Sequence, residues 1–503
     1  MAIWSWLSGR GCGVFLHLSA LPGGRGIGCF DKCAREFVLF LREAGMKYWQ
    51  ICPLNPTGYG DSPYQSPSTF AGNPYFIDTE ELVAHGLLRR CDLPPFEQRQ
   101  CGRVDFGNLY ENIWPTLRIA FENFSEAGSC AEEFENFCET CSWWLDEYAA
   151  FMALKNKFAG QSWLTWNAEF SDFHAAKTKI SCDEILKKSA QFHKFVQWLF
   201  HRQWRALKNF AAENGISIIG DIPIFVGLDS ADVWANVEIF KLQRDGSPKV
   251  VAGVPPDAFS DDGQVWGNPV YDWTVMENDD FSWWMKRIKR CAELYDVIRL
   301  DHFRGFHNYW EIATPVRTGA NGKWENAAGI KFFGRVKNIF PRIKLIAEDL
   351  GCLDDGVTEL LRETGLPGMN VLQFAFDGNR RNKYLPHEHE KNSTLYLGTH
   401  DNDTTRGWFH SLPESSRHQI RSYLRVDGSD IAWDLIRKAY ESPSNLLILS
   451  MQDILNLGSE ARFNTPNTNS GNWQWRMTLE QLHCAFDRQV PQYLNSLRDI
   501  YGR

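Results

Sequence analysis

Eight short apolar runs recur along the chain, and each ends in polar or charged residues. The runs are Gly13–Leu18, Tyr48–Cys52, Ile216–Asp221, Val297–Asp301, Leu345–Glu348, Asn370–Phe374, Leu395–Gly398 and Leu446–Ser450. Continuous apolar runs of about four to six residues are typical of strands that are buried on both faces. The pattern therefore predicts eight parallel strands.

Helical patterns separate several of these runs. Residues 37–43, 195–212 and 283–295 have helical periodicity and lead to the second, third and fourth runs. Strands that alternate with helices indicate the α/β class, and eight such units predict a closed (β/α)₈ TIM barrel. The alternative is an open doubly wound sheet. It is disfavoured because Gly23–Gly26, after the first run, lacks the spacing of a dinucleotide-binding loop.

The connections between the predicted strands differ greatly in length. We interpret residues 1–503 as a single barrel with two inserted subdomains, 54–215 after the second strand and 222–296 after the third. The first insertion opens with a loop rich in Gly and Pro, and the second holds a Gly- and Pro-rich stretch at residues 253–269. Loops that follow barrel strands form the active-site face, so two large insertions predict a deep cleft suited to a polymeric ligand.

Composition narrows the choice of partners. The 503 residues include 53 Lys and Arg against 62 Asp and Glu, a net charge of −9, which argues against a nucleic-acid partner. No apolar run reaches the ~18 residues of a membrane span, and no secretory signal is visible, so we expect no membrane partner and a cytoplasmic location.

The 13 Cys form no regular framework. Cys130, Cys138 and Cys141 are predicted to pack within a helix, because structural zinc needs four ligands.

Acidic residues stand at the carboxyl ends of several predicted strands. Asp221, Asp301 and Glu348 end the third, fourth and fifth runs, and His400 and Asp401 follow the seventh. A single acidic residue after a strand is often a helix N-cap or a turn residue, and we interpret Asp349 and Asp403 in that way. Several carboxylates on one rim are costly to bury together, so the set indicates a metal site or acid–base catalysis.

Glycoside chemistry fits this set better than a metal does. Only His400, with His302 further away, is placed as a nitrogen ligand, so no metal or cofactor is expected. Retaining glycosidases need two carboxyl groups about 5–5.5 Å apart. Arg299 shares a strand face with Asp301 and favours its charged form, as a nucleophile requires. Glu348 follows an apolar strand, which suits an acid/base.

Six longer motifs carry a family resemblance: Pro56–Gln65, Gly220–Phe225, Gly253–Asp257, Arg299–Gly305, Ala347–Gly351 and Gly398–Thr404. With them the sequence resembles the amylomaltases, or 4-α-glucanotransferases, of glycoside hydrolase family seventy-seven in the α-amylase clan. The resemblance extends from Leu18–Pro22 to Asn472–Trp473, nearly the whole chain.

The resemblance implies a barrel without a separate C-terminal β domain. It implies retaining transfer of α-1,4-glucan segments among maltooligosaccharides and glucose, with cyclic products from long donors. By motif match Asp301 is the nucleophile, Glu348 the acid/base and Asp401 the third carboxylate. The implied substrate contacts are Arg299, Asp221, His400, Tyr64, Trp266 and Ser62, with Tyr59 on a second glucan-binding surface. Residues 253–267, with Phe259 and Trp266, resemble a lid that excludes water.

Two other interpretations stay open at this point. An α-glucan hydrolase would use the same carboxylates and let water accept the sugar. A non-catalytic glucan-binding protein predicts the loss of Asp301 or Glu348, and the chain has both.

Overall fold

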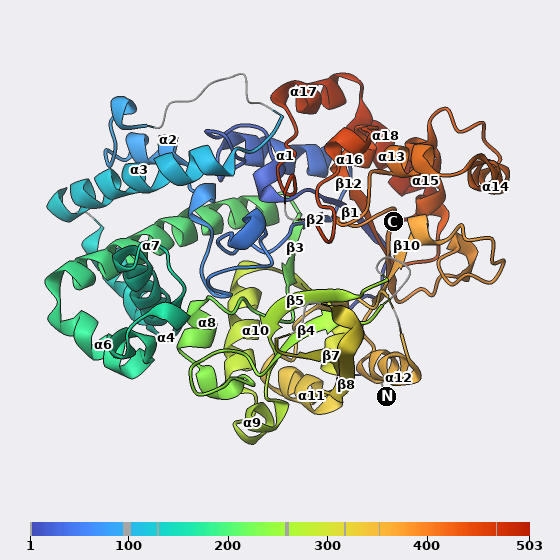
Figure 1. Cartoon of the computed structure of the whole chain (residues 1–503). Helices are drawn as coiled ribbons and strands as arrows, with labels where there is room; N and C mark the ends of the chain where they lie inside the picture. The colour runs from blue at the N-terminus through green and yellow to red at the C-terminus, as the bar shows by residue number, and fades with distance from the viewer. Residues whose placement is uncertain are drawn as a thin grey trace.

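The eight predicted runs form one parallel sheet in the computed structural model, which describes residues 3–93, 102–127, 130–256, 261–315, 318–351, 353–468 and 470–503 (Figure 1). The strands are β1 (Gly11–Phe15), β2 (Tyr48–Gln50), β3 (Ser217–Ile222), β6 (Val297–Leu300), β9 (Leu345–Ala347), β10 (Gly368–Val371), β11 (Ser393–Tyr396) and β12 (Leu446–Ser450). Their spatial order follows the chain, with β12 beside β1. The Ala347 N–H donates to the Pro367 carbonyl at 2.9 Å, which brings β9 against β10 and closes the barrel.

Burial explains why these runs become strands. β1, β6, β9, β11 and the apolar part of β12 are buried along their length, as expected for strands covered on both faces. The boundaries differ slightly from the apolar runs. The first strand ends at Phe15, and Leu18 begins a short 3₁₀ turn. The sixth run gives β10 only up to Val371, followed by a 3₁₀ turn at Leu372–Phe374.

Long helices cover the barrel. They are α1 (Lys32–Glu43), α7 (Glu184–Glu213), α10 (Ser282–Leu294), α11 (Ile330–Ile339), α12 (Asp355–Thr364), α15 (Ile431–Glu441) and α18 (Val490–Tyr501). Asp31, Asp183 and Asp354 accept backbone N–H groups at the starts of α1, α7 and α12, so local capping sets these boundaries. The connection from β10 to β11 has only 3₁₀ turns, in a stretch with three Asn and many charged residues.

The connection between β2 and β3 is mostly helical. Besides α7 it contains α2 (Thr79–Ala84), α3 (Phe106–Ala127), α4 (Ala131–Lys157), α5 (Ala168–Ser171) and α6 (Phe173–Cys182). These helices lie on the left in Figure 1, and α4 packs along α7. Cys138 and Cys141 lie within α4, which confirms the predicted helical setting for these two. The prediction is wrong for Cys130, which precedes the helix with a left-handed backbone and is exposed.

A second, antiparallel sheet was not predicted. It has the order β5 (Gln264–Pro269), β4 (Val250–Val254), β7 (Asn308–Ala313) and β8 (Gly322–Asn326). β4 and β5 come from the connection after β3, whereas β7 and β8 come from the connection after β6. The sheet therefore joins two segments that the pattern of insertions treated separately, and the subdomain boundaries stay a prediction.

The remaining helices are α8 (Ala231–Trp234), α9 (Trp273–Asn278), α13 (Thr405–Ser411), α14 (Glu414–Leu424), α16 (Met451–Ile454) and α17 (Leu479–Asp487). After β12 the described residues form helices and turns. Within the described part of the chain, no helix is both long and apolar enough to cross a membrane.

Candidate active site

Neighbouring strands bring Asp221 and Arg299 side by side. The two residues are register partners in β3 and β6, and Asp301 directly follows β6. Arg299 Nη1 donates to Asp221 Oδ2 at 2.6 Å and to Asp301 Oδ1 at 2.8 Å. Burial opposes the charge of Arg299, yet the two carboxylates raise the pKa of its guanidinium well above the usual value. One buried cation therefore serves two acidic side chains.

Glu348 stands at the end of β9, beside this pair. The backbone N–H of His302 donates to its Oε2 at 2.7 Å, and the N–H of Leu350 donates to its Oε1 at 3.1 Å. Burial raises the pKa of Glu348 to about 8, and the charge of Asp301 adds to the rise while Arg299 opposes it. At neutral pH Glu348 thus holds a proton that it can donate.

Asp401 lies on the other side of the mouth, after β11. Asn464 Nδ2 donates to Asp401 Oδ1 at 2.6 Å, and Arg462 Nη2 donates to the Asp401 carbonyl at 2.8 Å. His400 Nε2 is 3.5 Å from the same carboxyl oxygen. These contacts fix the orientation of a half-exposed carboxylate.

An aromatic group adjoins the carboxylates. The Tyr64 ring stacks on His400 with 5.2 Å between centroids, and the Trp473 ring is 5.7 Å from Tyr64. The Tyr64 hydroxyl donates to Asp221 Oδ2 at 2.8 Å, which ties the aromatic group to the buried cation. Ser62 Oγ accepts the Tyr64 N–H at 3.2 Å and so holds the local turn.

Trp266 projects from the small sheet toward the mouth. Its ring meets His302 edge-on at 4.9 Å between centroids, and its indole N–H donates to Gln264 Oε1 at 3.0 Å. Phe225, which follows β3, has its ring 6.4 Å from Trp266. The unpredicted antiparallel sheet therefore supplies one wall of the site.

These residues surround a cavity of about 370 Å³. Six of the predicted site residues line it: Ser62, Tyr64, Trp266, Asp301, His400 and Asp401. Three more predicted residues are hydrogen-bonded to the site without lining the cavity. Asp221 bonds to Tyr64 and Arg299 bonds to Asp301. Glu348 accepts the backbone N–H of His302. The side chain of Tyr59 and all of Phe259 lie outside the described residues.

The lining residues that the sequence did not assign to the site include Asn464, Trp473, Phe225 and Gln65. Phe225 and Gln65 lie inside recognised motifs, but nothing in the pattern assigned them a contact. Asn464 is 63 positions from Asp401, and no local signal links the two. Among the described residues, no group of three or more His, Cys, Asp or Glu is arranged to hold a metal ion.

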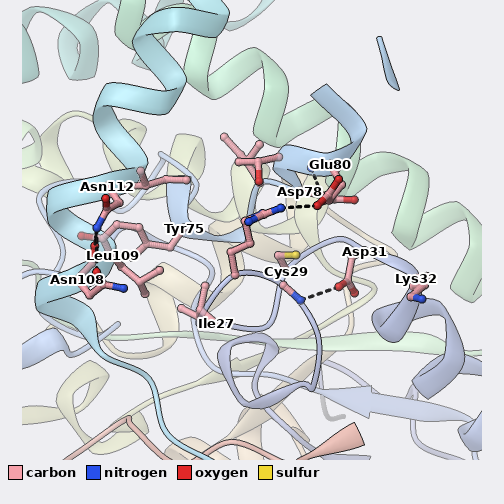
Figure 2. Close-up of a pocket in the computed structure, with 15 residues that line it drawn as sticks. Ile27, Cys29, Asp31, Lys32, Tyr75, Asp78, Glu80, Asn108, Leu109 and Asn112 are labelled. Carbon is pink, nitrogen blue, oxygen red and sulfur yellow. Dashed lines mark hydrogen bonds and ion pairs between the residues drawn. The ribbon is translucent and has the colours of Figure 1, made fainter. Parts of the chain in front are cut away.

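A separate cavity of about 380 Å³ lies between the loop after β1, the start of α2 and α3 (Figure 2). It also contains carboxyl groups. Asp31 Oδ2 accepts the Gly24 N–H at 2.8 Å, and its Oδ1 accepts the first N–H groups of α1. Asp78 caps α2, and Glu80 pairs with Arg25 at 2.6 Å. The carboxylates of this second cavity therefore have structural partners.

Comparison with known proteins gives consistent results. A family model described as 4-alpha-glucanotransferase matches residues 16–481. A 4-alpha-glucanotransferase of Thermus thermophilus is 46% identical over 483 residues, which are 94% of this chain and 96% of the relative. One of Clostridium butyricum is 44% identical and covers 97% of this chain and 100% of the relative. The structure of an amylomaltase from Streptococcus agalactiae in complex with acarbose matches with a TM-score of 0.94 at 38% identity, covering 98% of this chain and 99% of that one.

Proposed function

Because this chain belongs to the family of 4-alpha-glucanotransferases, we propose that its barrel mouth transfers α-1,4-glucan segments from one maltooligosaccharide to another. Asp301, Glu348 and Asp401 carry out the reaction by retaining double displacement. The observation that supports these roles is a pair of neighbouring groups. Arg299 donates to both Asp221 and Asp301, and the carboxyl group of Glu348 beside them has a raised pKa.

In the first step the Asp301 carboxylate attacks the anomeric carbon of the donor. Glu348 gives its proton to the glycosidic oxygen, so the leaving sugar departs as a neutral alcohol. Arg299 orients Asp301 by donating a hydrogen bond to its Oδ1. Asp401, held by Asn464, bonds hydroxyl groups of the donor sugar and stabilises the positive charge that develops on its ring.

The second step reverses the role of Glu348. Once Asp301 is esterified it has no charge, so one of the causes that raise the pKa of Glu348 disappears. Glu348 then takes the proton of the acceptor hydroxyl, whose oxygen displaces Asp301 from the sugar. Both carboxyl groups return to their starting states.

Selection of a sugar acceptor over water depends on the walls of the cavity. Tyr64, Trp473 and Trp266 offer flat apolar faces of the kind that pack on sugar rings. The segment proposed as the lid, residues 253–267, contributes Trp266 to this cavity, and the inserted segments 54–215 and 222–296 supply the sides of the cleft. Acceptor binding energy and exclusion of water both favour transfer over hydrolysis.

The acceptors are maltooligosaccharides and glucose, and long donors can be cyclised. No nucleic acid or membrane takes part. The enzyme works in the cytoplasm, in keeping with the free thiols of the described cysteines. Cell fractionation with an antibody against the chain tests the location.

The product pattern from maltotriose tests the reaction. Purified protein with maltotriose alone should give glucose and a series of glucans longer than the substrate. Asp301→Asn, expressed and purified in the same way, is the matched control and should give neither. Glucose and maltose in equal amounts, with no longer product, would identify a hydrolase and contradict the proposal.

A further inference from the structure

A third cavity, distinct from the barrel mouth and from the cavity of Figure 2, lies between α15, α17 and α18 and the chain that follows α16. Its volume is about 610 Å³, within the range of small-ligand sites. These helices lie together in the upper right of Figure 1. The cavity shares no lining residue with the catalytic cavity, and the proposed mechanism does not use it.

Two aromatic rings form one wall. Trp433 of α15 and Tyr493 of α18 have ring centroids 5.3 Å apart and planes inclined by 50°. Arg437 Nη1 donates to the Tyr493 hydroxyl at 3.3 Å and also pairs with Asp434, so a third side chain holds the pair in place. Tyr493 is 42% exposed although it is large and aromatic.

Polar groups of both signs surround this wall. Asp430, Glu480, Arg437 and Arg488 all line the cavity, and Asp430 Oδ1 accepts the Asn456 amide N–H at 3.1 Å. Arg437 is also paired with Asp434, so the wall is surrounded by hydrogen-bond donors and acceptors without a concentration of positive charge. Ile454 and Leu455 supply apolar surface. Flat aromatic faces with balanced donors and acceptors suit a neutral polyhydroxylated ligand, since a sugar ring has an apolar face and a polar edge.

The chain links this cavity to the catalytic one. Leu457 lines the outer cavity and Asn464 lines the barrel mouth, so the seven intervening steps span at most about 25 Å. Arg406 Nη1 donates to the Asn456 carbonyl at 3.1 Å, and Ser459 Oγ donates to Asp403 Oδ2 at 2.6 Å. These contacts hold the connecting segment against the rim of the barrel.

We propose that the cavity between α15, α17 and α18 binds a distal segment of the α-1,4-glucan whose other end occupies the barrel mouth. The inference rests on the proposed function for its substrate class. Glucosyl rings stack on Trp433 and Tyr493, and their hydroxyls bond to the surrounding charged groups. Binding at two places raises the effective concentration of a long chain at the catalytic cavity. Maltotriose is too short to gain from it.

The test compares long and short glucans. In the double variant Trp433→Ala, Tyr493→Ala, we expect the KM for amylose to rise about three- to tenfold. Retardation of the protein in a native gel containing amylopectin should weaken. The kcat/KM for maltotriose should stay within about twofold. Ile500→Ala is the matched control, because Ile500 is on α18, is 72% exposed and does not line the cavity; it should behave as the unaltered protein.

Two further variants separate binding from folding. Trp433→Phe with Tyr493→Phe keeps the aromatic faces and should restore the amylopectin retardation. Arg488→Ala removes an exposed polar group without disturbing the packing and should weaken retardation by itself. Unchanged retardation in the alanine double variant, or an equal loss on maltotriose, would overturn the inference. Failure of the unaltered protein to lengthen maltotriose would instead refute the proposed function.

Discussion

The barrel mouth and the cavity of Figure 2 both contain buried carboxyl groups with raised pKa values. Burial raises the pKa of Glu348 to about 8 at the mouth and that of Asp78 to about 6 in the other cavity. Yet Asp78 and Asp31 accept the first N–H groups of α2 and α1, whereas Asp221 and Asp301 share Arg299. A raised pKa is thus no sign of catalysis by itself. The two regions differ in the partners of their carboxyl groups. In the cavity of Figure 2 the carboxyl groups cap helices, whereas at the end of the barrel two of them share one cation.

The largest expected effect is at Asp301, the proposed nucleophile. Asp301→Asn should lower kcat for maltotriose disproportionation by at least ~10⁴-fold, since the covalent step is lost. Asp31→Asn, in the cavity of Figure 2, should leave kcat unchanged. Glucose release under saturating maltotriose measures both. Equal losses of kcat in the two variants would contradict the assignment of catalysis to the barrel mouth alone.

Glu348→Gln should lower kcat by about 10²- to 10⁴-fold, because proton donation to the leaving oxygen is lost. In the unaltered protein the rate of the first step should fall as the pH rises through about 8, where Glu348 loses its proton. The variant should lack this limb. A pH profile of single-turnover rates distinguishes the outcomes, and an identical limb in the variant would assign the titration to another group.

The same residue links pH to stability. Burial favours the protonated form of Glu348, so folding raises the pKa of this carboxyl group to about 8. The stability that the protonated Glu348 contributes is fully present below its unfolded-state pKa and is lost as the pH rises through about 8. Thermal unfolding at pH 5 and pH 9 should therefore show Glu348→Gln gaining in Tm relative to the unaltered protein at the higher pH. A constant difference would contradict the raised pKa.

Arg299→Lys tests the shared cation. Lysine keeps the charge but presents no planar fork, so it holds Asp221 and Asp301 less well at the same time. We expect kcat to fall about tenfold to hundredfold with the fold retained. Circular dichroism checks the fold, and product formation from maltotriose checks the rate. Full activity would show that the geometry of the guanidinium is unimportant.

The smallest effect belongs to the cavity of Figure 2. Asp31→Ala removes the acceptor for the N–H groups of Cys33 and Ala34 and should cost about 0.5–2 kcal/mol of stability. Its kcat should stay that of the unaltered protein. Denaturant unfolding and maltotriose turnover provide the two readouts. A fall in kcat without a loss of stability would show that this cavity contributes to the reaction.

Much of the site follows from local pattern. Asp221, Asp301 and Glu348 each stand at the end of an apolar run, and the carboxyl ends of barrel strands meet at one rim. Their convergence could therefore be predicted once the runs were interpreted as strands. The role of Asp401 came only from the family resemblance, because Asn464, which holds it, is far away in the chain.

The sequence by itself determined the eight strands, their order around the barrel and the ring of acidic residues. A strand that is buried on both faces is a continuous apolar run, and its end is marked by the next polar residue, so both are visible in neighbouring positions. Only the tertiary structure decided that Arg299 is shared, that β4 and β5 pair with β7 and β8, and that Trp433 meets Tyr493. These contacts join residues from separate elements. They depend on how the packed chain brings the elements together, and no local preference encodes that.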